Sequence, residues 1–499
     1  MYAKKILIPA LSVSAMLLLH SCACEDDPVT GRQAVPIFSY PHDDRLYAAL
    51  ECLPITPTVG NHPGPEYMGG TDGDRIAEGT HDDLEACALL LGRNEETLIL
   101  ISLDLLGILQ PRVDKIKDRL EARDLDPCKV VVASTHTHTG PDSVGMFGPD
   151  WNLTGLDMIY QDHLVDVAEE LVVAAGEAMV PVTATFATGT VNVPGSNYPS
   201  LMRDSRDPQV IDDRIHAIRF DGTDRGNVAT LVNYTNHPET AIDFDWYSAD
   251  YPRSLRERLT AEYGGGAIYF SGALGGLMTP IDVSVPARDE QGEPILEGGE
   301  QVWWTEDSWE RTRSYGYVLA EIVIDLLDAE VPSPVERIDV AHTQFLVPIT
   351  NVELWGAVVL GVVERMKIIR TQGCGLFGCG IGQASIITFG EAQITTSPGE
   401  TFPETIIGRE EVTIDYGAPW GPKTYEAIDG ILGRYTKPLA MHFGLADNFI
   451  GYIIPECDFL PSGHPEEYCE YFAVSRTGET LLREALIELL DAQAAKESP

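Results

Sequence analysis

Two histidines lie in a short polar segment, Ser134–Pro141, directly after a predicted buried strand that ends at Ala133. His136 and His138 are separated by one residue. Alternate residues of an extended chain share a face, so both imidazoles can point into one pocket. Neutral imidazole is the commonest transition-metal ligand, which makes the pair a candidate metal site. A histidine pair after a strand is also common as hydrogen-bonded or surface residues, so the pattern alone leaves both interpretations open.

A third histidine and a glutamate occupy comparable positions further along the chain. His237 follows the predicted strand 227–234, and Pro238 keeps the local backbone extended. Strand ends are where α/β folds place their sites. Glu400 comes after the tight turn of Pro398 and Gly399, which projects its carboxylate at the end of another strand. Each residue also has an ordinary structural interpretation, as a core histidine or a turn glutamate.

The elements that must position these residues alternate between strands and helices. Apolar runs predict strands at 97–103, 129–133, 227–234 and 267–270, and periodicity predicts helices at 111–123, 164–175, 252–263, 315–326 and 479–492. This alternation, with β-rich stretches after residue 340, indicates an α/β fold in which helices cover a mixed β-sheet core. We expect a single large domain over residues 46–495. The stretch 287–301 is expected to be a surface loop, and the apolar run 354–363 a core helix.

The composition limits the classes of function. Of 499 residues, 34 are Lys or Arg and 77 are Asp or Glu, which gives a net charge of −43. Phosphate contacts need clustered cations, so this charge argues against nucleic acid as a partner. It also argues against adhesion to anionic lipid through a basic patch. With 44% hydrophobic residues, the chain is able to bury a core.

The N-terminus has the pattern of an export signal. Lys4 and Lys5 precede an apolar stretch, residues 6–19, that is too short to span a membrane comfortably. The segment from Leu19 to Cys22 is similar to the bacterial lipoprotein signal. This similarity implies a signal peptide at 1–21, a lipidated Cys22, a tether at 22–45 and a location at the cell envelope. The alternative is an ordinary secretory signal cut near Ser21 or Ala23.

Export permits disulfides. Cys374 and Cys379 flank a glycine-rich turn, and Cys457 and Cys469 flank a Pro/Gly loop, so both are plausible local pairs. No second Cys or His pair lies near Cys374 and Cys379 at zinc-site spacing, which favours a disulfide over a metal there.

Five motifs in order resemble those of the neutral/alkaline non-lysosomal ceramidase family. They are Thr-His-Thr-His-Thr-Gly-Pro at 135–141, an Asn-x-x-x-His-Pro-like segment at 233–238, Ser-Ala-Asp-Tyr-Pro at 248–252, Pro-Gly-Glu at 398–400 and a late tyrosine segment at 445–453. The resemblance extends from about residue 50 to 480 and therefore covers nearly the whole expected domain.

The resemblance implies a single catalytic zinc and its ligands. Carried over residue by residue, the ligands are His136, His237, Glu400 and Tyr452, a set of N and O donors that suits catalytic zinc. His138 would lie beside the metal and serve proton transfer.

Further active-site positions are implied at Arg203, with Arg206 as a competing match, and at Tyr471. Asp104 and Asp250 are expected to support ligands or cap helices.

The sequence departs from the family at the nucleophile. Aligning back from Pro280 places Ala273 at the position of the family serine, and Ser271 lies two residues away. The nucleophile is therefore either Ser271 or a water molecule that zinc activates, and we favour water. The C-terminal β-sandwich domain of full-length ceramidases is also not expected in this chain.

Two functions remain as hypotheses. The first is a zinc-dependent hydrolase that cleaves an amide or ester of a lipid-like substrate, with ceramide as the family default, held at a membrane by its N-terminal lipid. The second is a catalytically silent envelope lipoprotein that retains the fold for binding or structure.

Overall fold

The computed structural model describes residue 38 and residues 40–59, 67–71, 73–150, 152–364 and 366–497. The predicted signal peptide, Cys22 and most of the predicted tether lie outside the described residues. Among the described residues, the first strand begins at Leu46. Among the helices that the structure describes, none is long and apolar enough to cross a membrane.

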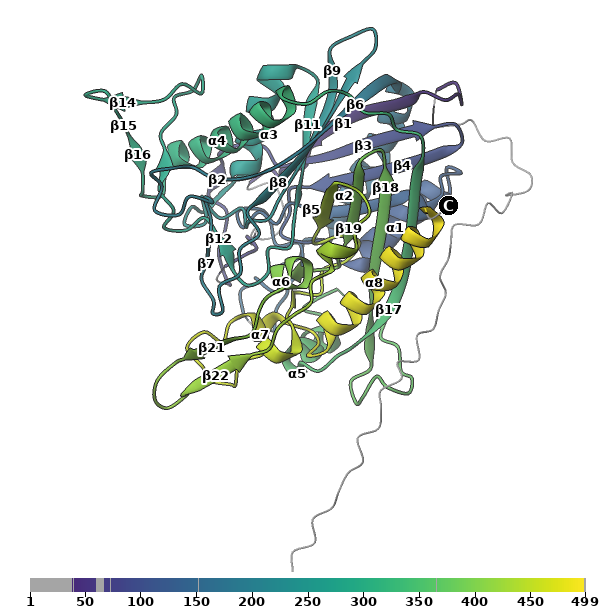
Figure 1. Ribbon diagram of the computed structural model, residues 1–499. Coiled ribbons are helices and arrows are strands. Elements are labelled where there is room, and N and C mark those ends of the chain that lie inside the picture. The colour runs from purple at the N-terminus through teal and green to yellow at the C-terminus, as the bar shows by residue number, and fades with distance from the viewer. Residues whose placement is uncertain are drawn as a thin grey trace, which may run out of the picture.

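The largest element is an eight-stranded mixed sheet (Figure 1). In spatial order its strands are β11 (Gly266–Ser271), β9 (Asn227–Tyr234), β8 (Arg214–Gly222), β6 (Val180–Thr190), β1 (Leu46–Pro54), β3 (Glu85–Arg93), β4 (Glu96–Leu103) and β5 (Val130–Ser134). The edge pairs β11–β9 and β4–β5 are parallel, and the pairs between them are antiparallel.

Both faces of this sheet are covered, which explains the continuous apolar runs in strands such as β4 and β5. In β4, Leu98 and Leu100 belong to one core cluster, whereas Ile99 and Ile101 belong to another on the opposite face. Because side chains of a strand alternate between faces, a strand covered on both sides needs apolar residues at every position.

A second, four-stranded sheet packs against one face of the first. Its order is β17 (Ile338–Pro348), β18 (Cys379–Phe389), β19 (Ala392–Thr396) and β23 (Leu439–Phe443). The two sheets share one hydrophobic core, in which Phe270 of β11 stacks on Phe443 of β23 with ring centroids 4.3 Å apart.

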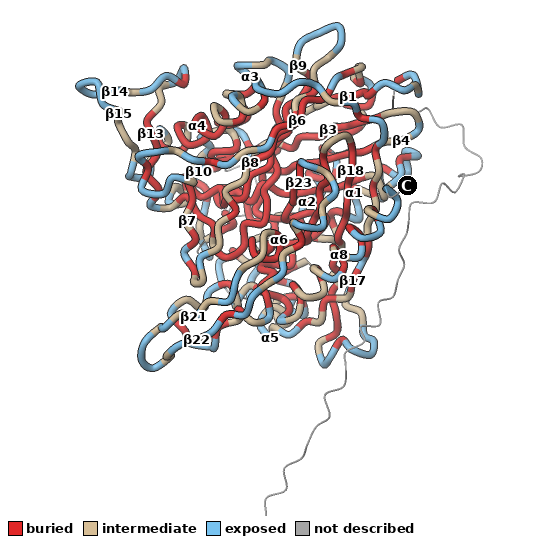
Figure 2. Tube along the Cα trace, viewed as in Figure 1, coloured by how far each residue is buried: buried red, intermediate tan, exposed pale blue. Residues whose placement is uncertain are grey.

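Helices cover the outer faces. Helices α1 (Gln110–Glu121) and α2 (Met158–Ala178) pack on one half of the large sheet, and α3 (Tyr251–Tyr263) and α4 (Trp309–Asp328) pack on the other half. Helix α8 (Gly478–Glu497) runs alongside β17 and β18 on the smaller sheet (Figure 1). The result is a helix–sheet–sheet–helix arrangement, with the buried strands inside and exposed hairpins at the edge (Figure 2). The predicted α/β fold with a mixed sheet covered by helices is confirmed.

The remaining elements are short. Helices α5 (Val352–Leu360), α6 (Pro403–Ile407) and α7 (Cys469–Phe472) lie near one end of the sheets. Two-stranded pairs are β2 (Gly79–Thr80) with β10 (Trp246–Tyr247), β7 (Arg203–Asp204) with β12 (Met278–Thr279), β13 (Val285–Pro286) with β16 (Trp303–Trp304), β14 (Leu296–Glu297) with β15 (Glu300–Gln301), β20 (Glu400–Thr401) with β24 (Tyr452–Ile453), and β21 (Val412–Asp415) with β22 (Pro422–Tyr425).

Two sequence predictions need correction. The apolar run 354–363 was expected to be a core helix, but of the residues in α5 only Val358 is buried. Apolar character alone does not distinguish a helix inside the core from one at the surface. The expected pair of Cys457 and Cys469 is also wrong, because neither forms a disulfide.

Two disulfides are present among the described residues. The predicted bond between Cys374 and Cys379 is confirmed, and a second bond joins Cys52 to Cys87. These last two residues are directly opposite each other on the antiparallel strands β1 and β3.

Candidate metal centre and active site

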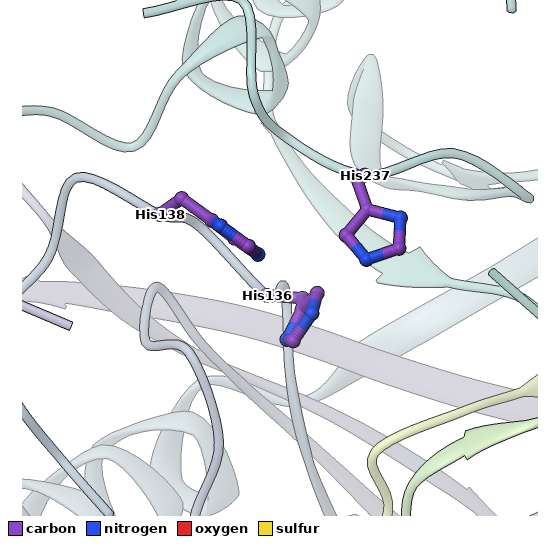
Figure 3. A group of neighbouring side chains, drawn as sticks. All are labelled: His136, His138 and His237. Atoms are coloured by element: carbon purple, nitrogen blue, oxygen red, sulfur yellow. The ribbon is translucent and has the colours of Figure 1, made fainter. Parts of the chain in front are cut away.

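Three buried histidines come together at one end of the sheets. Ligand atoms of His136, His138 and His237 all lie within 4.8 Å of one another, and their rings point toward a common space (Figure 3). The ring centroids of His136 and His138 are 4.8 Å apart, and those of His136 and His237 are 4.9 Å apart. The structure thus brings together residues that the sequence spaced about a hundred positions apart.

His136 is held by a local backbone conformation that we did not predict. The segment after β5 is not extended, because His136 has a φ of 70°, in the left-handed region that a non-glycine residue rarely adopts. Its amide donates to Leu105 O, and its Nδ1 donates to Leu106 O at 2.6 Å. A carbonyl oxygen only accepts, so Nδ1 carries the proton and the lone pair of Nε2 faces the cluster.

His237 follows the end of β9 and is oriented in the same way. Its amide and its Nδ1 both contact Met278 O, the ring nitrogen at 2.7 Å. This contact again places a proton on Nδ1 and directs Nε2 toward the other histidines. Backbone carbonyls that fix the tautomer of a ligand histidine are common around metal sites.

The two-stranded pair β20–β24 supplies a carboxylate and a phenol. Glu400 Oε2 lies 3.4 Å from His136 Nε2 and 3.3 Å from His237 Nε2. Strand β20 pairs with β24, which sets Glu400 directly opposite the buried Tyr452. The turn before Glu400 needs Gly399, since a Cβ there would lie 2.4 Å from Gly451 O. All four residues that the family resemblance implied as ligands are therefore neighbours.

Burial and mutual charge set the protonation of this group. Burial lowers the pKa of His138 well below its usual range, and the two neighbouring histidines lower it further. For Glu400, burial by itself raises the pKa, but His136 and His237 outweigh it and lower the pKa below its ordinary value. Burial lowers the pKa of His237, and Glu239 and Glu400 more than compensate, so that its pKa is raised. An ionised carboxylate beside imidazoles is a donor set that suits a divalent cation.

An unpartnered buried atom tests whether a metal fits. The ring proton of His136 sits on Nδ1, so Nε2 offers a lone pair. This Nε2 atom is buried and lacks a hydrogen-bond partner among the described residues. Buried polar atoms are rarely left unsatisfied in folded proteins. A cation coordinated by this nitrogen would satisfy it, so the residues present fit a metal ion.

Glu239 is a functional candidate that the sequence reasoning missed. Its Oε1 lies 3.3 Å from His138 Nδ1, and its Oε2 accepts a hydrogen bond from the hydroxyl of Thr279. Glu239 comes two residues after His237, so its position in the sequence was the available signal. Gly70 makes room on the other side, since a Cβ there would lie 2.7 Å from the His138 side chain.

Three other residues predicted at the site are not among those that line the pocket beside the cluster. Arg203 donates to Ile281 O and pairs with Asp282. Tyr471 is 46% exposed and donates to Glu467. Ser271 is buried and donates its hydroxyl at 2.7 Å to the carbonyl oxygen of Thr135, the residue before His136.

The alternatives and supporting residues are also placed. Arg206 forms a buried ion pair with Glu470. Asp104 forms a bidentate ion pair with Arg256 of α3. Asp250 caps the N-terminus of α3, which is one of the two roles expected for it.

An apolar pocket leads to the cluster. It contains about 810 Å³ of empty space, part of it open to solvent, and His136, His138, Glu400 and Tyr452 line it. Most of the remaining lining is aliphatic or aromatic, from residues 106–109, 144–147, 349–366 and 449–474. Tyr468 lines this pocket, whereas Tyr471 does not. An apolar cavity with a few convergent polar groups is typical of a ligand site.

Comparisons with known proteins agree with this architecture. The chain is similar to neutral ceramidase from Pseudomonas aeruginosa, with a TM-score of 0.65 and 13% identity over 91% of this chain and 75% of that chain. It is also similar to a ceramidase complexed with C2, with a TM-score of 0.63 and 13% identity over 91% of this chain and 76% of that one. No protein-family model and no curated protein sequence matches. The chain has a neutral ceramidase-like fold at a large sequence distance.

Proposed function

We propose that the protein is a zinc-dependent hydrolase that cleaves an amide or ester bond of a lipid-like substrate. The observation that carries this proposal is the buried histidine–carboxylate–phenol cluster at the end of an apolar pocket. The pocket suits a hydrocarbon chain, and the cluster suits a cation next to the polar group that follows such a chain.

The proposed zinc ligands are His136, His237, Glu400 and Tyr452. When bound, the ion would polarise a carbonyl group and lower the pKa of a water molecule to about 7. The chain itself contributes orientation, since backbone carbonyls at Leu106 and Met278 hold both histidine rings with Nε2 inward.

His138 is the proposed proton carrier. Burial and its histidine neighbours lower its pKa, so the ring is neutral and able to accept a proton from an attacking water. Glu239 beside Nδ1 favours the imidazolium that forms, and it orients the ring for return of the proton to the leaving group. The apolar lining of the pocket lowers the polarity around the ring and strengthens these interactions.

Ceramide is the proposed substrate by analogy with the two ceramidases of similar fold. Attack by water rather than by Ser271 is favoured, because the Ser271 hydroxyl is already donated to a backbone carbonyl. We also propose that Cys22 carries a lipid and holds the protein at the cell envelope, on the basis of the Leu19–Cys22 signal.

The experiment measures zinc content and turnover on the same purified sample. We expect about one zinc per chain and hydrolysis of long-chain N-acyl amides or the matching esters. His136→Ala should lose both zinc and turnover, and His163→Ala, a change at an exposed histidine of α2, should keep both. Zinc-loaded protein without turnover on either substrate class would contradict the proposal.

One observation favours a second candidate, a catalytically silent protein that retains the fold. Ala273 stands where the family has its serine, and Ser271 is not among the residues that line the pocket. Under this alternative, the zinc-loaded protein binds N-acyl lipids in the pocket without releasing a fatty acid. Detection of free fatty acid that depends on His138 would exclude it.

A further inference from the structure

Helix α5 exposes large apolar side chains to solvent. Val352, Val359 and Leu360 are 57%, 49% and 60% exposed. Its sequence is so apolar that it reads as a core helix, yet it lies at the surface. Contiguous exposed apolar groups on a soluble domain usually mark an interaction site.

A closed loop extends this apolar surface. The disulfide between Cys374 and Cys379 closes a short loop whose tip, Leu376, is 81% exposed. The neighbouring Phe377 packs on Trp355 of α5, with ring centroids 4.9 Å apart. The loop is thereby fixed to the helix, and Leu376 projects into solvent beside it.

Helix α7 and the residue before it add two aromatic residues with polar tips. The side chain of Asn351, at the start of α5, donates to the carbonyls of Glu470 and Tyr471, which joins α7 to α5. Tyr468 and Tyr471 are 42% and 46% exposed. We call the set Val352, Val359, Leu360, Leu376, Tyr468 and Tyr471 the apolar rim.

The apolar rim belongs to the elements that form the pocket. Leu354, Trp355 and Val358 of α5 line the pocket, as does Tyr468. The same helix therefore presents one set of side chains to the cavity and another set to solvent. A ligand that leaves or enters the pocket at this helix passes the rim.

Exposed cations flank the rim in a chain that is otherwise strongly acidic. Lys367 and Arg370 are exposed in the segment between α5 and the disulfide loop. Glu364 in the same segment is paired with the buried Arg112, at 2.8 Å. Aliphatic and tyrosine side chains bordered by Lys and Arg form the combination found where proteins meet lipid headgroups.

We propose that the apolar rim docks on a lipid bilayer surface and places the pocket against the membrane from which substrate is taken. This inference rests on the proposed function, because a lipid-like substrate resides in a bilayer. Insertion would be shallow, since no described helix is able to span. The rim side chains would enter the headgroup region, and Lys367 and Arg370 would contact phosphate groups.

The test is flotation with vesicles of phosphatidylethanolamine and phosphatidylglycerol. Every sample is the full chain with Cys22→Ala, so that no lipid anchor contributes and the N-terminus is the same throughout. Leu360→Asp and Leu376→Asp are the rim variants. The matched control is Leu296→Asp, because Leu296 is 57% exposed on the β14–β15 hairpin, well away from α5 (Figure 1).

We expect each rim variant to partition about tenfold or more weakly, which corresponds to losing the transfer of one leucine side chain from water. The control should partition like the parent chain. Equal partition of rim variants and parent would overturn the proposal, as would an equal loss in the control. A parent chain that is dimeric by light scattering and becomes monomeric with Leu376→Asp would also overturn it, in favour of a second copy as the occupant.

Turnover separates this inference from the proposed function. Rim variants should lose hydrolysis of substrate embedded in vesicles and retain hydrolysis of a soluble short-chain substrate. No turnover of either substrate by the parent chain would refute the proposed function, and the flotation result would still decide the docking surface.

Discussion

Replacing Glu400 by glutamine gives the sharpest test of the metal centre. Glu400 Oε2 contacts Nε2 of both His136 and His237, at 3.4 and 3.3 Å, so a single carboxylate oxygen links two of the proposed ligands. Glu400→Gln keeps the shape and the backbone pairing with Tyr452, and it removes only the charge and the second oxygen. An amide is a weaker ligand than a carboxylate, so the loss should appear in metal affinity rather than in folding.

The expected magnitude follows from the four-ligand set. Four-ligand structural zinc sites bind with about 10–16 kcal/mol, so an average ligand contributes about 2.5–4 kcal/mol. Loss of a whole ligand would raise the zinc dissociation constant by about 10²–10³-fold, which is the upper limit for the variant because its amide oxygen remains. The assay is competition with a chromogenic chelator at fixed pH, with thermal unfolding of the metal-free proteins as the folding control.

A buried glutamate outside the pocket provides the matched variant. Glu479 is 2% exposed and pairs with Arg483 on α8. Glu479→Gln should bind zinc like the unsubstituted protein. If Glu400→Gln also retains the original affinity, Glu400 is not a ligand and the proposed donor set is refuted.

Four further outcomes are expected. His138→Ala should retain zinc and lower kcat by roughly 10²–10⁴-fold, and unchanged kcat would place His138 outside the chemistry. Ser271→Ala should keep most turnover, and an acyl adduct trapped on Ser271 would reverse the choice of nucleophile. Burial raises the pKa of Glu470, but Arg206 outweighs it and lowers the pKa below 4.5, so the pair's contribution to stability is present above pH 4.5 and lost as pH falls. The stability of Glu470→Gln should therefore fall less steeply with decreasing pH than that of the unsubstituted protein. Equal slopes would count against a stabilising role of the Arg206–Glu470 pair. Cys22→Ala should stall processing or lower the share of the protein held at membranes of the producing cell, leaving only the attachment through the apolar rim, and full retention with normal processing would exclude lipidation.

The buried strands and the strand-end histidines were predictable, because they depend on local patterns. Strand β4 was expected at 97–103 and is observed at Glu96–Leu103, since both of its faces are covered and residues 98–101 form a continuous apolar run. His237 was expected at a strand end and lies just beyond β9. Bringing these groups to Glu400 and Tyr452 required the family resemblance, because no local pattern encodes contacts between two separate sheets.

The errors arose where tertiary structure overrides local pattern. The bond between Cys52 and Cys87 depends on the register of β1 against β3, which the sequence does not display. Tyr468 directly precedes α7 and lines the pocket, whereas Tyr471 lies within α7 and does not, a difference that the sequence does not display. The left-handed backbone at His136 is likewise imposed by its surroundings rather than by its residue type.

The shared core between the two sheets has a consequence for how the protein matures. His136 and His237 follow strands of the eight-stranded sheet, whereas Glu400 and Tyr452 belong to the part of the chain that builds the smaller one. A folding intermediate with only one sheet formed would lack half of the donors. Such an intermediate could not capture a cation tightly, so metal uptake would coincide with the docking of one sheet on the other. A cation bound there would link the two layers of the fold. Its removal should raise amide hydrogen exchange first along β19 and β23 rather than at the outer helices.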